Sequence, residues 1–324
     1  MRSSGWDTAL AAGVPVDGHG RRFKKLRVSI TETCNFRCLY CGGDACRRGI
    51  GTTPLSAPEI IAICKGLCNV GIEEIRLTGG EPTLRSDLKV IVTGLSGLPL
   101  RKLGLTTNAM LLKPLLPFLD TTACRHINIS LDSLKPGRFR TITGSRGFED
   151  VLDAVIRASK MGFHVKLNTV LLRGVNDDEV FDYLDFSARY NIEVRFLELM
   201  RIGPMVAESP ELFVSAHEVI DRIRQSCHLL PELREKDSTS FNFRTDSGSR
   251  IGFIASESRP FCGACTRLRL TSRGTLRACL MDDCEINIRR LEPAEYPKVL
   301  RKALGLKPAC GMVRTRRSMC SLGG

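Results

Sequence analysis

Short apolar runs alternate with longer amphipathic segments through the first two thirds of the chain. The apolar runs predict strands over Leu26–Ile30, Glu74–Thr78, Leu103–Thr106, His126–Ser130, His164–Val170 and Glu193–Leu197. The segments between them predict helices over Ala57–Asn69, Asp87–Leu95, Leu111–Leu119, Phe148–Met161 and Asp178–Tyr190. Repeated strand–helix units are typical of a parallel sheet, either open or closed into a full or partial barrel. In such folds the chemistry lies at the carboxyl ends of the strands.

The pattern changes after Gly203. Helices are predicted over Ala216–Ser226 and Ala294–Ala303, with strand-like pieces at Phe241–Phe243, Ile251–Ile254 and Leu268–Thr271. We therefore expect an α/β chain with four parts. These are an N-terminal extension (1–20), a main domain (21–203), a smaller C-terminal α+β domain (204–304) and a tail (305–324).

The composition fits a globular protein with an anionic partner. Of 324 residues, 43% are hydrophobic and 26% are charged, and no apolar run approaches the ~20 residues of a membrane helix. The formal charge is +13, which favours an anionic partner such as a phosphorylated small molecule, a nucleic acid or a membrane surface, although a basic surface alone also explains it. Fourteen cysteines without an evident export signal indicate thiols or metal ligands, so we expect a cytoplasmic protein.

The first cysteine group, Cys34, Cys38 and Cys41, forms Cys-x3-Cys-x2-Cys directly after the first predicted strand. Three thiolates in one loop can bind three irons of a [4Fe–4S] cube and leave the fourth iron open. A zinc site is the alternative. Zinc usually takes four ligands in paired Cys-x2-Cys units, and nearby Cys46 completes no such pair. The spacing therefore favours an iron–sulfur cluster.

The second group, Cys262, Cys265 and Cys279, forms Cys-x2-Cys-x13-Cys. Here too three ligands are evident, which fits a second cluster with an open iron. Cys284 lies five residues further on and can complete a zinc site or a closed cluster, so the spacing alone leaves a structural site open.

Two arginines, Arg267 and Arg269, stand between these cysteines. On an extended segment residues i and i+2 point to the same side. A pair of guanidiniums beside a metal site suits a phosphate group, although a solvated strand face is the simpler alternative.

The second predicted strand ends in Gly79-Gly80-Glu81-Pro82. Glycines allow the backbone to approach a ligand closely, and an acidic side chain can accept a hydrogen bond from an ammonium group. Tyr40, just before Cys41, and this turn one strand later together resemble the radical S-adenosylmethionine superfamily. That resemblance implies a cluster whose open iron chelates S-adenosylmethionine and whose electron releases a 5′-deoxyadenosyl radical.

Further motifs make the chain similar to one family, the GTP 3′,8-cyclases that begin molybdenum cofactor biosynthesis. The resemblance runs from about Asp17 to the last residue. It rests on the two cysteine groups, the Gly-Gly-Glu-Pro turn and a terminal Gly323-Gly324, together with residues 26–31, 104–108, 127–132, 165–168 and 195–200. It implies a partial TIM-type barrel of parallel strands with a smaller C-terminal domain that carries the second cluster.

The resemblance also implies roles for single residues. The cluster ligands are Cys34, Cys38 and Cys41, then Cys262, Cys265 and Cys279, and the second cluster binds the guanine base. The S-adenosylmethionine contacts are Tyr40, Gly80, Ser130 and Met200. The GTP contacts are Arg27, Arg76, Thr106, Lys166, Arg267, Leu268 and Arg269. Gly323 and Gly324 reach the active site, and no residue is assigned as an acid or base. The product is 3′,8-cyclo-7,8-dihydroguanosine triphosphate.

Partners follow from the same resemblance. We expect GTP as substrate, a low-potential electron donor of the flavodoxin or ferredoxin type, and a downstream pterin monophosphate synthase. A homodimer is one possible assembly, and neither a membrane nor a nucleic acid is expected as a partner. Two alternatives stay open: a radical enzyme that acts on another substrate such as a peptide, against which Arg267 and Arg269 argue, and a zinc-stabilised nucleic-acid-binding protein.

Overall fold

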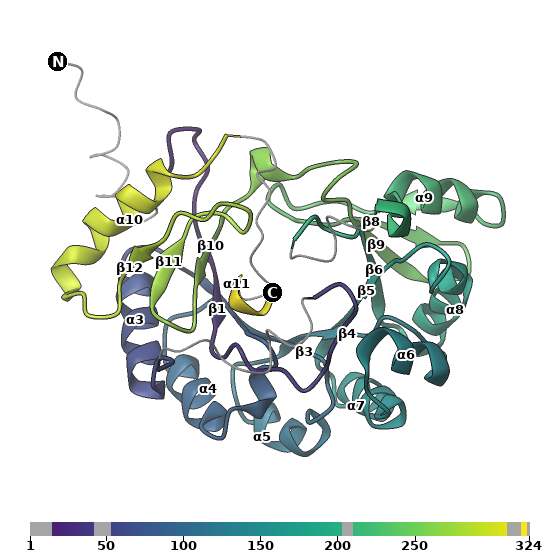
Figure 1. Cartoon of the computed structure of the whole chain (residues 1–324), viewed down its shortest axis with the longest axis horizontal. Helices are drawn as coiled ribbons and strands as arrows, with labels where there is room; N and C mark the ends of the chain where they lie inside the picture. Colours follow the sequence, from purple (N-terminus) through teal and green to yellow (C-terminus); the bar gives the residue numbers. More distant parts are fainter. Residues whose placement is uncertain (1–14, 42–52, 203–209, 310–318, 323–324) are drawn as a thin grey trace.

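The computed structural model describes residues 15–41, 53–202, 210–309 and 319–322. Its strands form one 12-stranded sheet that curls into an open barrel (Figure 1). Six parallel strands lie side by side in chain order: β1 (Lys25–Ser29), β2 (Glu74–Thr78), β3 (Lys102–Thr107), β4 (His126–Ser130), β5 (His164–Val170) and β6 (Glu193–Leu197). All six strands predicted from the sequence form, and the partial barrel is confirmed.

The strands after residue 204 extend this sheet at both edges. At one edge β9 (Arg250–Ile254) pairs parallel with β6 and continues into β8 (Phe241–Thr245) and β7 (Leu229–Pro231). At the other edge β10 (Arg267–Leu270) pairs parallel with β1 and continues into β11 (Thr275–Arg277) and β12 (Ile286–Asn287). The second cysteine group therefore lies beside the strand that carries the first.

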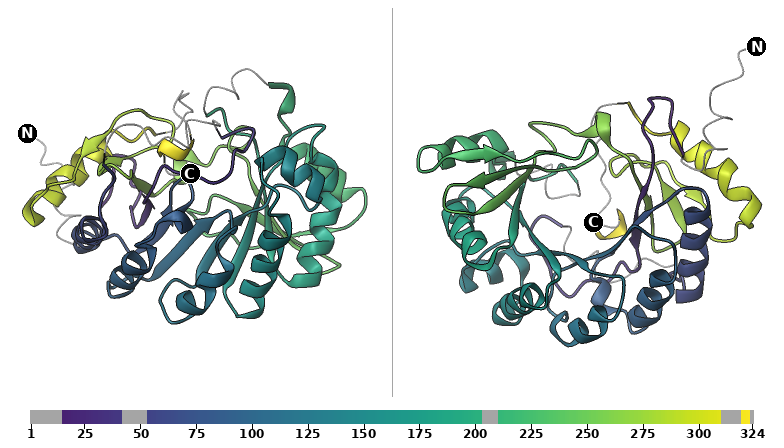
Figure 2. Two further views of the ribbon diagram at one scale, coloured as in Figure 1. Left: turned by 60° about the horizontal axis from the view of Figure 1, so that its bottom comes forward. Right: turned by 180° about the vertical axis from the view of Figure 1, so that it is seen from behind.

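Helices cover the outer face of the sheet (Figures 1 and 2). They are α3 (Ala57–Asn69), α4 (Leu88–Ser96), α5 (Leu116–Asp120), α6 (Pro136–Thr143), α7 (Phe148–Lys160) and α8 (Val180–Tyr190), followed by α9 (Ala216–Arg224) and α10 (Tyr296–Gly305). The short α11 (Met319–Leu322) is not part of this outer layer. The helix predicted over Leu111–Leu119 is a 3-10 turn, Lys113–Leu115, followed by the short α5, because Pro114 and Pro117 interrupt the hydrogen-bond ladder. Among the described residues, none of these helices has the length and apolar character needed to cross a bilayer.

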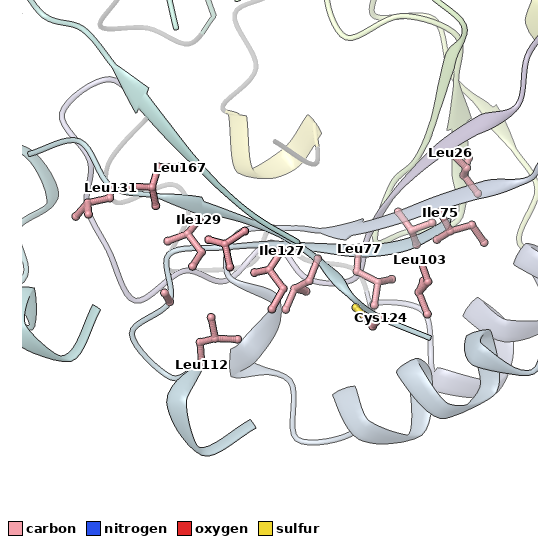
Figure 3. Packing of buried hydrophobic residues seen from close by; sticks show 14 of the residues in the cluster. Leu26, Ile75, Leu77, Leu103, Leu112, Cys124, Ile127, Ile129, Leu131 and Leu167 are labelled. Atoms are coloured by element: carbon pink, nitrogen blue, oxygen red, sulfur yellow. The ribbon is translucent and has the colours of Figure 1, made fainter. Parts of the chain in front are cut away.

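Alternation along the strands separates the core from the barrel interior. Leu26, Ile75 and Leu77 are at most 1% exposed and point towards the helices (Figure 3). Each such side chain contributes about 1.5–3 kcal/mol through burial. The residues between them, such as Arg27 and Arg76, point into the barrel and line its cavities. The alternation that buries apolar side chains on the outer face of the sheet therefore directs the cations between them into the barrel.

Two elements that the sequence did not predict lie close to the barrel mouth. α6 is short and polar, begins at Pro136 and ends at Gly144, whose φ of 68° suits glycine. α11 lies within the ring of strands, seen from both sides in Figures 1 and 2. Its Leu322 is buried against Ile202 and Met281. Gly323 and Gly324 lie outside the described residues, as do Cys46 and Cys310.

Candidate active site

The first cysteine loop is held by the carboxyl end of α6. The backbone N–H groups of Arg37 and Leu39 donate to the carbonyls of Thr143 (2.8 Å) and Ile142 (2.9 Å). The last carbonyls of a helix lack partners within the helix, so the loop satisfies them. The purple loop after β1 runs to α6 in Figure 1. A helix that the sequence pattern missed therefore fixes the loop that carries Cys34, Cys38 and Cys41.

The Gly79-Gly80 turn packs directly on the same loop. Gly80 donates its N–H to the carbonyl of Thr31 at 2.7 Å, and Glu81 donates to the carbonyl of Thr33 at 2.8 Å. A β-carbon on Gly80 would overlap the Thr33 carbonyl oxygen and lie 2.6 Å from the Glu32 carbonyl oxygen. Glycine is needed here because two backbones meet.

Glu81 itself is a buried tie between strand ends. Its carboxylate accepts from the Thr83 hydroxyl (2.6 Å) and backbone N–H (3.0 Å), from the Thr107 hydroxyl (2.7 Å) and from the Asn108 N–H (2.7 Å). Burial raises the pKa of this carboxyl, while these donors act in the opposite direction. The Glu81 carboxylate thus joins the turn after β2 to the end of β3. This structural role comes in addition to the hydrogen bond with an ammonium group that the sequence suggests.

The second cysteine group is surrounded by cations. Cys262 lies in a 3-10 turn, Cys262–Ala264, and Cys265 precedes β10. The Arg267 guanidinium donates to the Cys265 sulfur at 3.3 Å. Burial raises the pKa of the Cys265 thiol, but Arg267 and Lys307 outweigh it and lower the pKa to about 6. Since the thiolate is the form that binds metals, this environment suits a cluster ligand.

Both cysteine groups line one cavity of about 320 Å³, which we call the cluster cavity. Cys284, the candidate fourth ligand of a closed site, is exposed and is not among its lining residues. Among the described residues, no three His, Cys, Asp or Glu side chains converge tightly enough for a single metal ion. A cube spreads its irons over four corners, so three spaced thiols at each end of the cavity fit two clusters.

The predicted S-adenosylmethionine contacts Tyr40, Gly80, Ser130 and Met200 all line the cluster cavity. The Tyr40 hydroxyl donates to the Asp132 carboxylate at 2.6 Å, and the Val170 N–H donates to the other Asp132 oxygen at 2.9 Å. Burial raises the pKa of Asp132 to about 6, against the effect of these two donors. Asp132, which was not predicted, thereby anchors the first cysteine loop to β4 and β5.

Three arginines lie in one row across neighbouring strands. Arg27 of β1 is in register with Arg269 of β10 on one side and with Arg76 of β2 on the other. Burial, and then the charges of Arg269, Arg267 and Arg76, hold the pKa of Arg27 well below its usual value. Burial, followed by the charge of Arg195, lowers the pKa of Arg76 to about 10. The row is a concentrated positive field suited to a polyanion.

A second cavity of about 370 Å³, the amino-end cavity, lies where the parallel strands begin. Arg76 and Lys166 line it, whereas Thr106 and Arg269 line the cluster cavity. The two cavities share the lining residues Arg27, Asn128, Arg195, Thr239 and Arg267. The predicted GTP contacts are thus divided between two cavities that share part of their walls. Leu268 is fully buried in the core, so only its backbone can contribute.

Arg195 of β6 lines both cavities and was not assigned from the sequence. The sequence feature that could have identified Arg195 is its position two residues after Glu193, which places both side chains on the same face of the strand. Glu193 accepts from Lys166 (2.7 Å) and from Arg195 (2.6 Å). Burial opposes ionisation of Glu193, but Arg195 and Lys166 outweigh it and lower its pKa to about 2.

Glu193 should make stability depend on pH. Its folded pKa of about 2 is below its ordinary value of 4.5, so its contribution is present above pH ~4.5 and is lost as the pH falls towards 2. We expect Glu193→Gln to lower the free energy of unfolding by about 3 kcal/mol at pH 7. The deficit should shrink by more than half at pH 3. Urea denaturation at both pH values checks this, with the exposed Asp185→Asn as the control expected to show no such pH-dependent deficit.

Lys307 ties together the segments that carry two of the second group's cysteines. Its ammonium donates to the carbonyls of Arg267 (3.0 Å) and Ala278 (2.5 Å), and the residue is 5% exposed. Lys307→Met keeps the side chain's length but removes these bonds. We expect anaerobic reconstitution to yield about four irons per chain in place of about eight. The control is Lys302→Met, a change at an exposed position that should leave the iron content at about eight per chain. Full iron content in Lys307→Met as well would show that Lys307 is not needed to hold the second cluster.

The comparisons with known proteins agree with this geometry. Residues 28–187 match the Radical SAM superfamily, and residues 192–309 match Molybdenum Cofactor Synthesis C. The GTP 3′,8-cyclase of Synechocystis sp. is 42% identical over 309 residues, which cover 95% of this chain and 94% of the relative. The chain belongs to the GTP 3′,8-cyclase family. As predicted, it is a radical S-adenosylmethionine enzyme, and two [4Fe–4S] clusters with S-adenosylmethionine are its cofactors.

Other relatives of the GTP 3′,8-cyclase family are similar over most of this chain. The Clostridium botulinum (strain Hall) GTP 3′,8-cyclase is 36% identical and covers 85% of this chain and 86% of its own length. Molybdenum cofactor biosynthesis protein 1 of Mus musculus is 39% identical, over 84% of this chain and 44% of the mouse protein. Membership excludes the zinc-stabilised nucleic-acid-binding alternative.

One solved structure shares the fold at low sequence identity. SuiB of Streptococcus suis, bound to S-adenosylmethionine, matches with a TM-score of 0.65 at 15% identity, over 89% of this chain and 69% of SuiB. At that identity the likeness supports the barrel and no more. The substrate must therefore be inferred from the residues that line the two cavities.

Proposed function

We propose that this chain converts GTP and S-adenosylmethionine into 3′,8-cyclo-7,8-dihydroguanosine triphosphate, methionine and 5′-deoxyadenosine. The observation that carries the proposal is the cluster cavity, which is lined by both cysteine groups and by Arg27 and Arg269 of the arginine row. The family's printed activity supports it. So does the net charge of +13, since GTP carries roughly four negative charges.

The chemistry divides between cofactor and protein. When bound by Cys34, Cys38 and Cys41, the first cluster supplies the electron that cleaves the sulfonium and so yields the 5′-deoxyadenosyl radical. Tyr40, Gly80, Ser130 and Met200 hold S-adenosylmethionine beside it. The chemistry so supplied would remove the hydrogen from C3′ of the ribose and transfer it to 5′-deoxyadenosine. A bond between C3′ and C8, with one added electron and one proton, completes the product.

The protein's part is orientation. The guanine base lies against the second cysteine group, while Arg27, Arg267 and Arg269 bind the phosphates. Arg76 and Lys166 extend that binding towards the amino-end cavity. Fixing the base and the phosphates at separate points keeps C8 close to C3′. Such positioning replaces acid–base catalysis in this reaction.

The remaining partners follow from the same reaction. A low-potential flavodoxin or ferredoxin supplies the electrons, and a pterin monophosphate synthase takes the unstable product. Both fit a cytoplasmic enzyme. α11 in the barrel mouth supports a role near the substrate for the Gly323-Gly324 end that follows it.

A labelled substrate tests the proposal. GTP with deuterium at C3′ is incubated with reconstituted protein, S-adenosylmethionine and dithionite. Mass spectrometry should find one deuterium in 5′-deoxyadenosine and an equal amount of cyclised product. Unlabelled 5′-deoxyadenosine together with unchanged GTP would reject GTP as the substrate.

A further inference from the structure

The outer side of the first cysteine loop carries a group of exposed arginines. Arg37 and Leu39 lie in the loop, and Arg140 and Arg146 lie on and just after α6. We call these four residues the α6 patch. Backbone bonds from Arg37 and Leu39 to Thr143 and Ile142 hold the loop to the helix, so the patch is one continuous surface.

The arginines of the α6 patch differ from their cationic neighbours in their ion pairing. On the same helix Arg138 pairs with Asp178 and Glu179, and Lys135 pairs with Asp182. Within the described part of the chain, no carboxylate forms an ion pair with Arg37, Arg140 or Arg146. Glu149 and Asp150 follow in the first turn of α7 and mark the boundary of the patch.

An apolar residue lies among these cations. Leu39 is 37% exposed although it is a large hydrophobic side chain, and it stands between Cys38 and Tyr40. Leu39 therefore offers a partner protein one apolar contact within a positively charged surface. Its position beside a cluster ligand puts any such partner next to the first cluster.

The direction of electron delivery follows from the cavity. On the proposed function, S-adenosylmethionine and GTP fill the cluster cavity before the reaction begins. The electron must then enter the first cluster from the side of its loop that faces away from this cavity. The four patch residues are exposed and do not line the cavity, so the α6 patch fits that side. This argument rests on the proposed function.

We propose that the α6 patch is the docking surface for an acidic electron-carrier protein of the flavodoxin or ferredoxin type. Carboxylates on the carrier pair with Arg37, Arg140 and Arg146, and Leu39 packs against its apolar centre. One electron passes from the carrier, which is oxidised by one electron, to the first cluster, which is reduced by one. No bond is made or broken in this step. Because the attraction is between surface charges, salt weakens it.

The test separates the carrier from the chemistry. Wild type and the double variant Arg140→Glu/Arg146→Glu, each with both clusters, receive electrons in three arms. One arm uses dithionite, one a purified bacterial flavodoxin with its NADPH-dependent reductase, and one a reduced bacterial ferredoxin. We expect the double variant to lose at least ~10-fold in rate at low salt with one or both proteins and nothing with dithionite. The protein arm that loses more identifies the carrier.

Controls distinguish the possible failures. Arg157→Glu, on the exposed outer side of α7, should keep all three rates, and Arg140→Gln/Arg146→Gln should lose less than the double glutamate variant. Unchanged rates with both carriers, or an equal loss with dithionite at full iron content, would overturn the docking surface. 5′-Deoxyadenosine and cyclised product are counted separately. Carrier-dependent 5′-deoxyadenosine with unchanged GTP would reject the proposed function and leave the docking surface in place.

Discussion

Replacing Gly80 by alanine is expected to remove the first cluster and abolish turnover. The new methyl group would overlap the carbonyl oxygen of Thr33, and it has no room to turn away because Glu32 lies on the same side at 2.6 Å. Both obstacles are backbone atoms, so the loop that carries Cys34 must move. Forcing extra atoms into such a contact costs roughly 1–3 kcal/mol, and the displaced thiols no longer meet one cube.

Iron analysis after anaerobic reconstitution measures this effect. Gly80→Ala should retain about four irons per chain, those of the second cluster, and should form no 5′-deoxyadenosine. Gly137→Ala is the matched control, because a β-carbon there meets nothing within 4 Å. The variant should still bind GTP, since the arginine row lies deeper in the barrel. About eight irons in Gly80→Ala would show that the contact between turn and loop is dispensable.

Arg269→Ala should weaken GTP binding by about 10- to 100-fold. Arg269 is 7% exposed, lines the cluster cavity and is in register with Arg27. Burial and the neighbouring Arg267 lower its pKa to about 10, which is the sign of a cation held near other cations. A bound triphosphate relieves that repulsion, and the variant loses both the relief and a charge-assisted hydrogen bond.

Equilibrium titration with GTP under anaerobic conditions measures the change. The thermal midpoint of the free protein, measured on the same samples, reports whether Arg269 also stabilises the fold. Arg157→Ala, which removes an exposed arginine of α7, should alter neither quantity. Weaker GTP binding with an unchanged midpoint would mean that Arg269 acts on the ligand alone, whereas a lower midpoint would mean that it also stabilises the fold. Unchanged GTP binding would show that Arg269 is not part of the GTP site.

The strands could be predicted because each is a short segment rich in Val, Ile or Leu that ends at a turn. β2, β4, β5 and β6 have the predicted bounds. α6 could not be predicted, since Pro136-Gly137 at its start and few apolar residues give no helical period. Its stability comes from packing, with Phe139 and Ile142 buried beneath it. β7, β11 and β12 have two or three residues each and depend on pairing with their neighbours.

The parts of the site that depend on the spacing of residues along the chain could be predicted. The parts that depend on which strands pair, and in which register, were harder to predict. The cysteine groups could be read from their intervals. That Arg27, Arg76 and Arg269 form one row depends on the pairing of β10 with β1, which no local pattern specifies. Lys307 and Asp132 were missed for the same reason. Each acts through contacts with segments that are distant in the sequence.

The pairing of β9 with β6 and of β10 with β1 has a consequence for synthesis of the chain. Until these late segments leave the ribosome, the nascent half-barrel exposes its backbone N–H and C=O groups along both flanks. Unpaired flanks of this kind invite association with other chains. Iron insertion at the second cysteine group must therefore wait for the whole polypeptide, whereas the first cysteine loop emerges while translation is still under way.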